Sequence, residues 1–139
     1  MVVPFLVKAT LFADGGSRGN PGPAAGGAVL YADDGEVLEE VGTFLGVTTN
    51  NVAEWTGLLG GLKAALKHGV DDLTIRLDSE LVVKQLSGAY RVKHAGLIPL
   101  HAEAKALLRR FAHVDVRHVP RKENKAADAV VNQVLDAHR

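Results

Sequence analysis

The 139-residue sequence predicts an α/β fold built on one five-stranded mixed sheet flanked by helices. Three observations support this fold class. Three short segments rich in strand-forming residues come first. Apolar residues then recur at helical spacing, and from there strand-like and helical segments alternate. The length fits a single domain with a buried core.

The first 46 residues favour a three-stranded antiparallel meander. Residues 5–13 (FLVKATLFA) are rich in Phe, Leu, Val and Thr, and they end at Asp14 before a loop rich in Gly and Pro. A second strand is expected at residues 25–32 and a third at residues 37–46, with the turn signal DDGE between them.

The segment that follows has a helical period. Apolar side chains recur at helical spacing over residues 50–69, and Asn50 or Asn51 is expected to cap the start of this helix. The pair Gly60-Gly61 inside it costs helix stability. We interpret the pair as a mark of close packing between helix and sheet.

Strands and helices alternate in the second half of the chain. Strands are expected at residues 73–78 and 113–119, and the alternation with helices indicates that both run parallel to the first strand. A loop is expected at residues 120–124. The expected helices cover residues 79–88, with Ser79 as the cap, 97–112 and 125–139.

The charges are unevenly distributed although the formal net charge is zero. Residues 1–83 hold 5 Lys/Arg and 11 Asp/Glu, a net charge of −6, whereas residues 84–139 hold 11 and 5, a net charge of +6. Acidic patches attract cations and basic patches attract phosphates. The alternative is that both sets of charges are solvated faces without a partner.

The composition excludes several classes of protein. The absence of cysteine excludes a disulfide framework, a thiolate metal site and a cysteine nucleophile. The start of the chain lacks the pattern of a signal peptide, and no apolar run approaches the about 18 residues that a membrane span needs. We therefore expect a cytoplasmic protein without a membrane association.

Four acidic side chains are expected to converge. Asp14 and Asp78 end strands that we expect to be parallel neighbours, so both project from the carboxyl edge of the sheet, where open α/β sheets place their sites. Glu54 and Asp128 lie within about the first turn of their helices. Taken singly, each acid has a structural alternative, for example a favourable helix N-terminal charge for Asp128 and an Asx-type turn before the Ser79 cap for Asp78. The joint placement of the four favours a site.

A cluster of four carboxylates requires a compensating charge, because the carboxylates repel and raise one another's pKa. Carboxylates and waters suit a hard divalent cation such as Mg²⁺ or Mn²⁺. Four carboxylates also allow two ions about 3.5–4 Å apart, the arrangement that stabilises the attacking and leaving oxygens in phosphoryl transfer. The residues therefore point to metal-dependent phosphoryl transfer.

Four segments resemble, in order, the signature blocks of the ribonuclease H family, type 1. They are FADGGSRGNPGPAAGGAVL, TTNNVAEWTGLLGGLKAAL, LDSELVVKQLSG and PRKENKAADAVVNQVLD. The likeness covers about residues 7–137, and the compact stretch SGAYRVKHAGLIPL resembles the subgroup without a basic handle. The resemblance implies the ribonuclease H-like fold, with a single ribonuclease H domain over residues 1–139.

The resemblance also implies an activity. It is endonucleolytic hydrolysis of the RNA strand of RNA/DNA hybrids, with two Mg²⁺ or Mn²⁺ ions, leaving 5′-phosphate and 3′-hydroxyl ends. No obligate protein partner is implied, so we expect a monomer. Four residues sit on the positions of the family that bind the metal and carry catalysis: Asp14, Glu54, Asp78 and Asp128.

The resemblance assigns substrate contacts to two further stretches. Gly19 and Asn20 match the loop after the first strand, which contacts sugar hydroxyls in the family. Thr49 and Asn20 would hold a phosphate of the DNA strand, and Asn50 and Asn51 would contact base edges in the minor groove. The alternative for the TTNN stretch is helix capping alone.

Three residues depart from the pattern of the family. Glu80 stands where many members carry Gln, so it either adds negative charge at an expected base contact or faces solvent. His118 has an offset similar to that of a loop histidine in other members, but HVDVRHV is strand-like, so we expect a strand residue without a catalytic role. Arg121 lies in the loop and is expected to hold a phosphate. It stays protonated and cannot act as a general base.

Three other functions are less consistent with the sequence. A nucleic-acid binding module with degenerate catalysis would be favoured by the loss of an acid, and all four are present. A junction resolvase, or the nuclease of a retroelement polyprotein, would lack the GNPGP and TTNN blocks. The basic second half and the open loop argue against a metal-dependent phosphatase that acts on small molecules.

Overall fold

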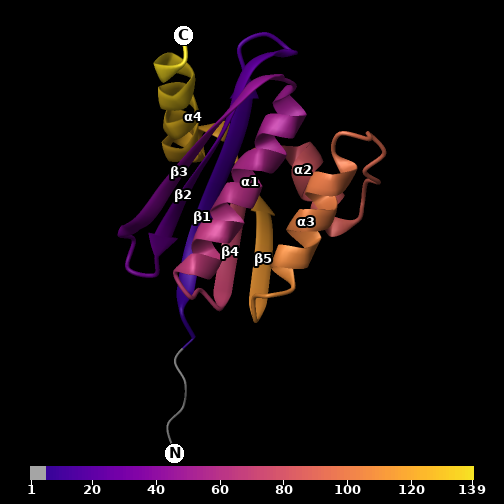
Figure 1. Cartoon of the computed structure of the whole chain (residues 1–139). Coiled ribbons are helices and arrows are strands. Elements are labelled where there is room, and N and C mark those ends of the chain that lie inside the picture. The colour runs from indigo at the N-terminus through magenta and orange to yellow at the C-terminus, as the bar shows by residue number, and fades with distance from the viewer. Residues whose placement is uncertain (1–5) are drawn as a thin grey trace, which may run out of the picture.

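The computed structural model describes residues 6–139, which are built on one five-stranded sheet with the strand order β3-β2-β1-β4-β5 (Figure 1). β1, β2 and β3 pair antiparallel, β4 pairs parallel to β1, and β5 pairs parallel to β4. The mixed sheet predicted from the sequence is therefore confirmed. The strands are β1 (Lys8–Ser17), β2 (Gly22–Ala32), β3 (Val37–Thr48), β4 (Asp72–Leu77) and β5 (His113–His118).

Helices cover both faces of the sheet. α1 and α3 lie on one face and α4 lies on the other (Figure 1). Within residues 6–139, no helix is both long enough and apolar enough to cross a membrane. The helices are α1 (Asn50–Lys67), α2 (Glu80–Ser87), α3 (Ile98–Leu108), the short 3-10 helix η1 (Arg121–Glu123) and α4 (Lys125–Ala137).

Each face of the sheet has its own apolar core. The larger core lies between the sheet and α1, α2 and α3, and Leu11, Trp55 and Ile75 are fully buried in it. The smaller core lies under α4, where Val131 and Leu135 pack beside Ala25 of β2. Burial of this apolar surface on both faces fixes the sheet between its helices.

α1 approaches the sheet so closely that side chains are excluded at the contact. A Cβ atom on Gly57 of α1 would fall on the carbonyl oxygen of Asp14, and a Cβ on Gly15 of β1 would fall on the backbone of Ala53 and Glu54. Glycine allows two backbones to approach in this way. β1 and α1 are thereby held together beside Asp14.

The same packing confirms the interpretation of the Gly60-Gly61 pair. A Cβ atom on Gly61 would run into the side chain of Leu11 on β1. A Cβ on Gly60 would meet only the side chain of Val41 on β3, with 3.1 Å to its Cγ1 atom. Gly61 lowers the intrinsic stability of the helix, but it allows α1 to pack closely against Leu11 of the sheet.

The prediction that Asp14 ends the first strand is wrong. β1 continues to Ser17, and Asp14 lies within the ladder opposite Gly27 of β2. Pairing continues because glycines stand on both strands where α1 passes closest, so their poor intrinsic strand preference is overridden by packing. The predicted strand began at residue 5, which lies outside the described residues.

The predicted cap of the long helix is also wrong. Thr49 precedes the helix, and its Oγ1 accepts a hydrogen bond from the backbone N–H of Val52 at 3.3 Å. Asn50 and Asn51 are the first residues of α1 itself. Ser79 caps α2 as expected, since its Oγ accepts from the backbone N–H of Val82 at 3.2 Å. The expected loop at 120–124 contains η1.

We expect Gly57→Ala to lower the free energy of unfolding by about 2 kcal/mol or more, because the added methyl group meets backbone that cannot move aside. Gly60→Ala in the same helix is the matched control. Its methyl group meets only Val41, and the gain in helix propensity of about 1 kcal/mol offsets that contact. Urea unfolding of both variants measures the difference. Equal free energies of unfolding would show that the contact between α1 and β1 tolerates a side chain at position 57.

Candidate active site

The four acidic residues come from four different elements that end or begin beside one another. Asp14 lies on β1, and Asp78 directly follows β4, which is the parallel neighbour of β1. Glu54 is the fifth residue of α1, and the glycine contact described above places it against β1. Asp128 is the fourth residue of α4, on the other face of the sheet.

The structure brings all four acids to one cavity. Its volume is about 300 Å³. It lies at the edge of the sheet that contains the carboxyl ends of the parallel strands β1 and β4. Asn50 and Arg121 share this cavity with the acids. The residues that line it are Asp14, Gly15, Gly16, Asn50, Glu54, Asp78, Arg121 and Asp128.

The cavity places four acids beside one cationic side chain, Arg121. Burial, with the neighbouring Asp78 next in importance, raises the pKa of Asp14 to about 7. Burial also raises the pKa of Glu54, again with a contribution from Asp78, while Arg121 acts in the opposite direction. Because the charged carboxylates are disfavoured here, the site attracts a cation.

The carboxylates surround the cavity rather than meeting at one point. Among residues 6–139, no group of three or more His, Asp or Glu side chains is arranged to hold an ion as it stands. This arrangement still suits Mg²⁺, which typically takes one or two carboxylates and completes its coordination with waters and substrate phosphates. The donor set of the cavity therefore fits a hard divalent cation that is bound together with a phosphate.

The loop after β1 is tied to the start of α1. The side-chain oxygen of Asn20 accepts from the backbone N–H of Asn50 at 3.1 Å. The side-chain oxygen of Asn50 accepts from the backbone N–H and the hydroxyl of Ser17, at 2.8 and 2.9 Å. Gly19 in this loop has a φ of +91°, which glycine adopts without strain. Asn50 thus lines the cavity with the carboxylates, and Asn20 is held against the backbone of Asn50.

The remaining residues of the TTNN stretch differ in their surroundings. The hydroxyl of Thr49 is engaged as the cap of α1. The side-chain oxygen of Asn51 is buried and has no hydrogen-bond partner within residues 6–139. Capping therefore accounts for Thr49 but not for Asn51.

The three departures from the family pattern differ in their surroundings. Glu80 is exposed and forms an ion pair with Lys84 at 2.7 Å, which lowers the pKa of Glu80. His118 is the last residue of β5, as expected, and its ring Nε2 lies 3.2 Å from the backbone oxygen of Asp78. Arg121 begins η1 and lines the cavity itself.

Asn124 is a residue of the site that the sequence did not reveal. It is fully buried, and its side-chain NH₂ donates to the backbone oxygen of Ala13 at 2.9 Å and to Oδ2 of Asp78 at 3.2 Å. In the sequence it stands directly before the last helix, where Asn is a common cap. The sequence feature that could have identified it is an amide side chain four positions before Asp128, within the PRKEN loop.

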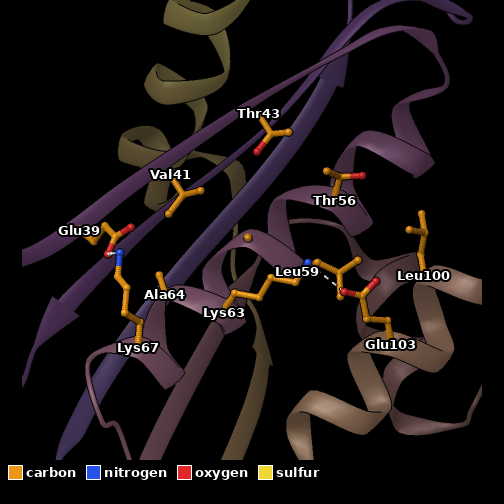
Figure 2. A pocket seen from close by; sticks show the side chains of 11 residues that line it. Glu39, Val41, Thr43, Thr56, Leu59, Lys63, Ala64, Lys67, Leu100 and Glu103 are labelled. Carbon is orange, nitrogen blue, oxygen red and sulfur yellow. Dashed lines mark ion pairs between the residues drawn. The ribbon is translucent and has the colours of Figure 1, made fainter.

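A larger cavity of about 490 Å³ lies away from these acids, between α1, β3 and α3 (Figure 2). The acids that line it are already paired, Glu39 with Lys67 at 2.6 Å and Glu103 with Lys63 at 2.9 Å. Its charges are compensated, in contrast to those beside Asp14. The smaller cavity is therefore the candidate active site.

Two curated relatives are similar over most of this chain. The bifunctional protein Rv2228c of Mycobacterium tuberculosis is 46% identical over 132 residues, which cover 94% of this chain and 36% of that protein. Ribonuclease HI of Halobacterium salinarum is 46% identical over 123 residues, which cover 88% of this chain and 62% of that protein. The chain spans less than two thirds of the length of either relative.

Two solved structures share the fold closely. The crystal structure of RNase H1 from Halobacterium salinarum superposes with a TM-score of 0.87 at 44% identity and covers 96% of this chain and 99% of that one. The structure of LC11-RNase H1 in complex with an RNA/DNA hybrid gives a TM-score of 0.86 at 36% identity, with coverages of 94% and 98%.

The match to a protein family includes all four acids. The model of the reverse transcriptase-like family matches residues 12–134. Between the end of α2 at Ser87 and the start of α3 at Ile98 there is no inserted helix, so the connection is short. The chain therefore belongs to the reverse transcriptase-like family of ribonuclease H-type domains, and its short connection fits the compact type 1 form.

Proposed function

We propose that the chain is an endonuclease that hydrolyses the RNA strand of RNA/DNA hybrids. The observation that carries this proposal is the single cavity lined by four carboxylates from four elements, in a chain of this family. The name of the halobacterial relative and the hybrid bound to LC11-RNase H1 support the same substrate. Residues 1–139 would act as one ribonuclease H domain, as a monomer in the cytoplasm.

The carboxylate cavity would take two Mg²⁺ ions, or Mn²⁺ in their place. Asp14, Glu54, Asp78 and Asp128 would hold them, and the ions would offset the burial and the neighbouring carboxylate of Asp78 that raise the pKa of Asp14. The chemistry that such ions supply is Lewis-acid stabilisation of the attacking and leaving oxygens, which would leave 5′-phosphate and 3′-hydroxyl ends.

The polar residues beside the acids would bind and orient the substrate. The side-chain oxygens of Asn20 and Asn50 are already engaged with protein N–H and O–H groups. Their amide nitrogens remain as donors, which suit the oxygens of phosphates, sugars and base edges. Close approach of the backbone at Gly19 would serve recognition of the 2′-hydroxyl, the group that distinguishes RNA from DNA.

Arg121 would hold a phosphate at the mouth of the cavity. Its guanidinium group acts on Glu54 as a nearby positive charge, and it lines the same cavity as the acids. Arginine remains protonated and offers several N–H donors in a fixed plane, which suits a phosphate group but excludes proton abstraction. Its role would therefore be in binding, while His118 stays outside the cavity lining.

We expect the chain to cleave a 5′-labelled RNA/DNA hybrid in Mg²⁺ or Mn²⁺ and to lose this activity in EDTA. Asp14→Asn and Asp78→Asn should each lower the rate by more than about a hundredfold, because loss of even an outer-shell partner of a bound metal costs about 10–100-fold. Gel electrophoresis measures the cleavage, and phosphatase treatment and ligation identify the product ends.

Asp115→Asn is the matched control for these variants, since Asp115 is an exposed acid paired with Arg117 on β5 at 2.7 Å. Single-stranded RNA and duplex DNA serve as control substrates. If the hybrid binds to the wild-type chain but stays intact with both metals, the chain is a binding module and the proposed hydrolysis is wrong.

The raised pKa of Asp14 predicts how the metal-free protein responds to pH. An acid with a pKa of 3.8 in the unfolded chain and about 7 in the folded chain binds more protons when folded. Below pH 3.8 Asp14 is protonated, and its contribution to the free energy of unfolding is at its highest value. As the pH rises to about 7, Asp14 ionises in the folded chain and this contribution is lost. Asp14→Asn removes this loss, so its Tm in EDTA at pH 8 should exceed that of the wild type by roughly 5 °C or more.

Thermal unfolding at pH 5 and pH 8 tests this expectation. The advantage of Asp14→Asn should grow from the lower to the higher pH, and added Mg²⁺ should raise the Tm of the wild type at pH 8 by binding only the folded state. An advantage that is independent of pH, or a Tm insensitive to Mg²⁺, would contradict the account of the charges in the cavity.

A further inference from the structure

We propose that Asn124 is a positioning residue that fixes three elements of the carboxylate site relative to one another. The proposal rests on the proposed function, because it concerns how the chain holds its metal-binding acids. Asn124 has no exposed surface, and its side chain reaches both Ala13, the neighbour of Asp14 on β1, and the carboxylate of Asp78. Its backbone belongs to the start of α4, which carries Asp128.

The orientation of the Asn124 amide is set by its partners. A backbone carbonyl oxygen and a carboxylate are both acceptors, so only the NH₂ end of the amide can face them. With the amide turned the other way, its oxygen would stand against two acceptors. The amide thus holds one oxygen of Asp78 toward the protein, and the other oxygen stays available to a cation.

Asn124 gives up its usual helix role to make these contacts. Asn at the residue before a helix normally accepts a hydrogen bond from the first turn. Here the side chain makes no cap, while its backbone oxygen accepts from the N–H of Asp128 at 3.2 Å. The residue therefore connects the start of α4, and with it Asp128, to β1 and to Asp78.

The burial of Asn124 is costly for the fold. Its side-chain oxygen is buried and has no hydrogen-bond partner within residues 6–139. A buried polar atom without a partner destabilises the folded protein. The unpartnered oxygen lowers stability, but the NH₂ group of the same amide orients Asp78 and holds β1 and α4 in place. This role explains why an amide stands at position 124.

The test compares Asn124→Ala and Asn124→Leu with the wild-type chain. Ala removes the amide, and Leu also fills its space, so that a cavity is not the common cause of the effects. Binding of Mn²⁺ alone is followed by the electron paramagnetic resonance signal of free Mn²⁺, and the Mg²⁺ dependence of hybrid cleavage is measured beside it. Circular dichroism shows at each temperature which variants are folded.

We expect both variants to bind Mn²⁺ about tenfold more weakly or worse, as is usual when an outer-shell partner of a metal ligand is lost. The Mg²⁺ concentration for half-maximal cleavage should rise in parallel, while the KM for the hybrid stays within twofold. Activity should recover partly at high Mn²⁺. Recovery of this kind distinguishes misplaced ligands from a chain that has simply lost its fold.

Gln85→Ala is the matched control. Gln85 is the other buried amide of the described chain, and its side-chain oxygen accepts from Nε1 of Trp55 at 3.3 Å instead of contacting a carboxylate. It should lower the Tm and leave Mn²⁺ binding within twofold of the wild type. If Gln85→Ala weakens Mn²⁺ binding as much as Asn124→Ala does, the effect is one of stability and the positioning role is overturned.

The outcomes separate the two proposals. If the wild type binds Mn²⁺ and cleaves the hybrid but an Asn124 variant that remains folded binds Mn²⁺ equally well, only the positioning role is wrong. If the wild type neither binds Mn²⁺ nor cleaves the hybrid, the proposed function is wrong, and the inference falls with it.

Discussion

The contact between the backbones of β1 and α1 is the constraint on which the site depends. At Gly15 and Gly57 the strand and the helix touch without side chains between them. A strand that passes under a helix at ordinary distance would separate Asp14 from Glu54 by a layer of side chains. The glycines remove that layer, so that an acid of the sheet and an acid of the helix share one cavity. The parallel pairing of β1 with β4 then adds Asp78, and α4 adds Asp128 from the opposite face.

Placement of Asp14 and Glu54 in the cavity works against the stability of the folded chain. The pKa of Asp14 rises to about 7 and that of Glu54 also rises, mainly through burial. Arg121 is the cationic side chain that lines this cavity, whereas the larger cavity beside α3 has a lysine for each acid. The four acids of the smaller cavity thus share one cationic side chain, whereas the acids of the larger cavity are each paired with a lysine. Binding of divalent cations is the function that best fits four carboxylates and an open cavity.

Much of the fold and the acids of the site could be predicted from the sequence, because both are expressed in local patterns. Alternation of apolar residues and turn signals located all five strands and the four longer helices. Asp78 and Asp128 stand near the element boundaries that these signals mark, whereas Asp14 lies inside its strand. The errors arose where tertiary contacts override local preference. β1 runs on through Gly15 and Gly16, where it pairs with β2 and contacts α1. Thr49 caps α1, and the side chain of Asn50 contacts Ser17 instead of capping the helix. Asn124 was missed because its partners lie 111 and 46 residues away in the sequence.

The central claim is that the cavity beside Asp14 holds divalent cations together with a substrate phosphate. Anomalous diffraction from Mn²⁺ in crystals of the Asp128→Asn variant, bound to an RNA/DNA hybrid, tests it most directly. The account predicts manganese peaks inside the cavity, in contact with Asp14 and with the phosphate of the RNA strand. Manganese found only elsewhere, for example beside Glu39 and His68, or a hybrid bound away from the four acids, would contradict the account.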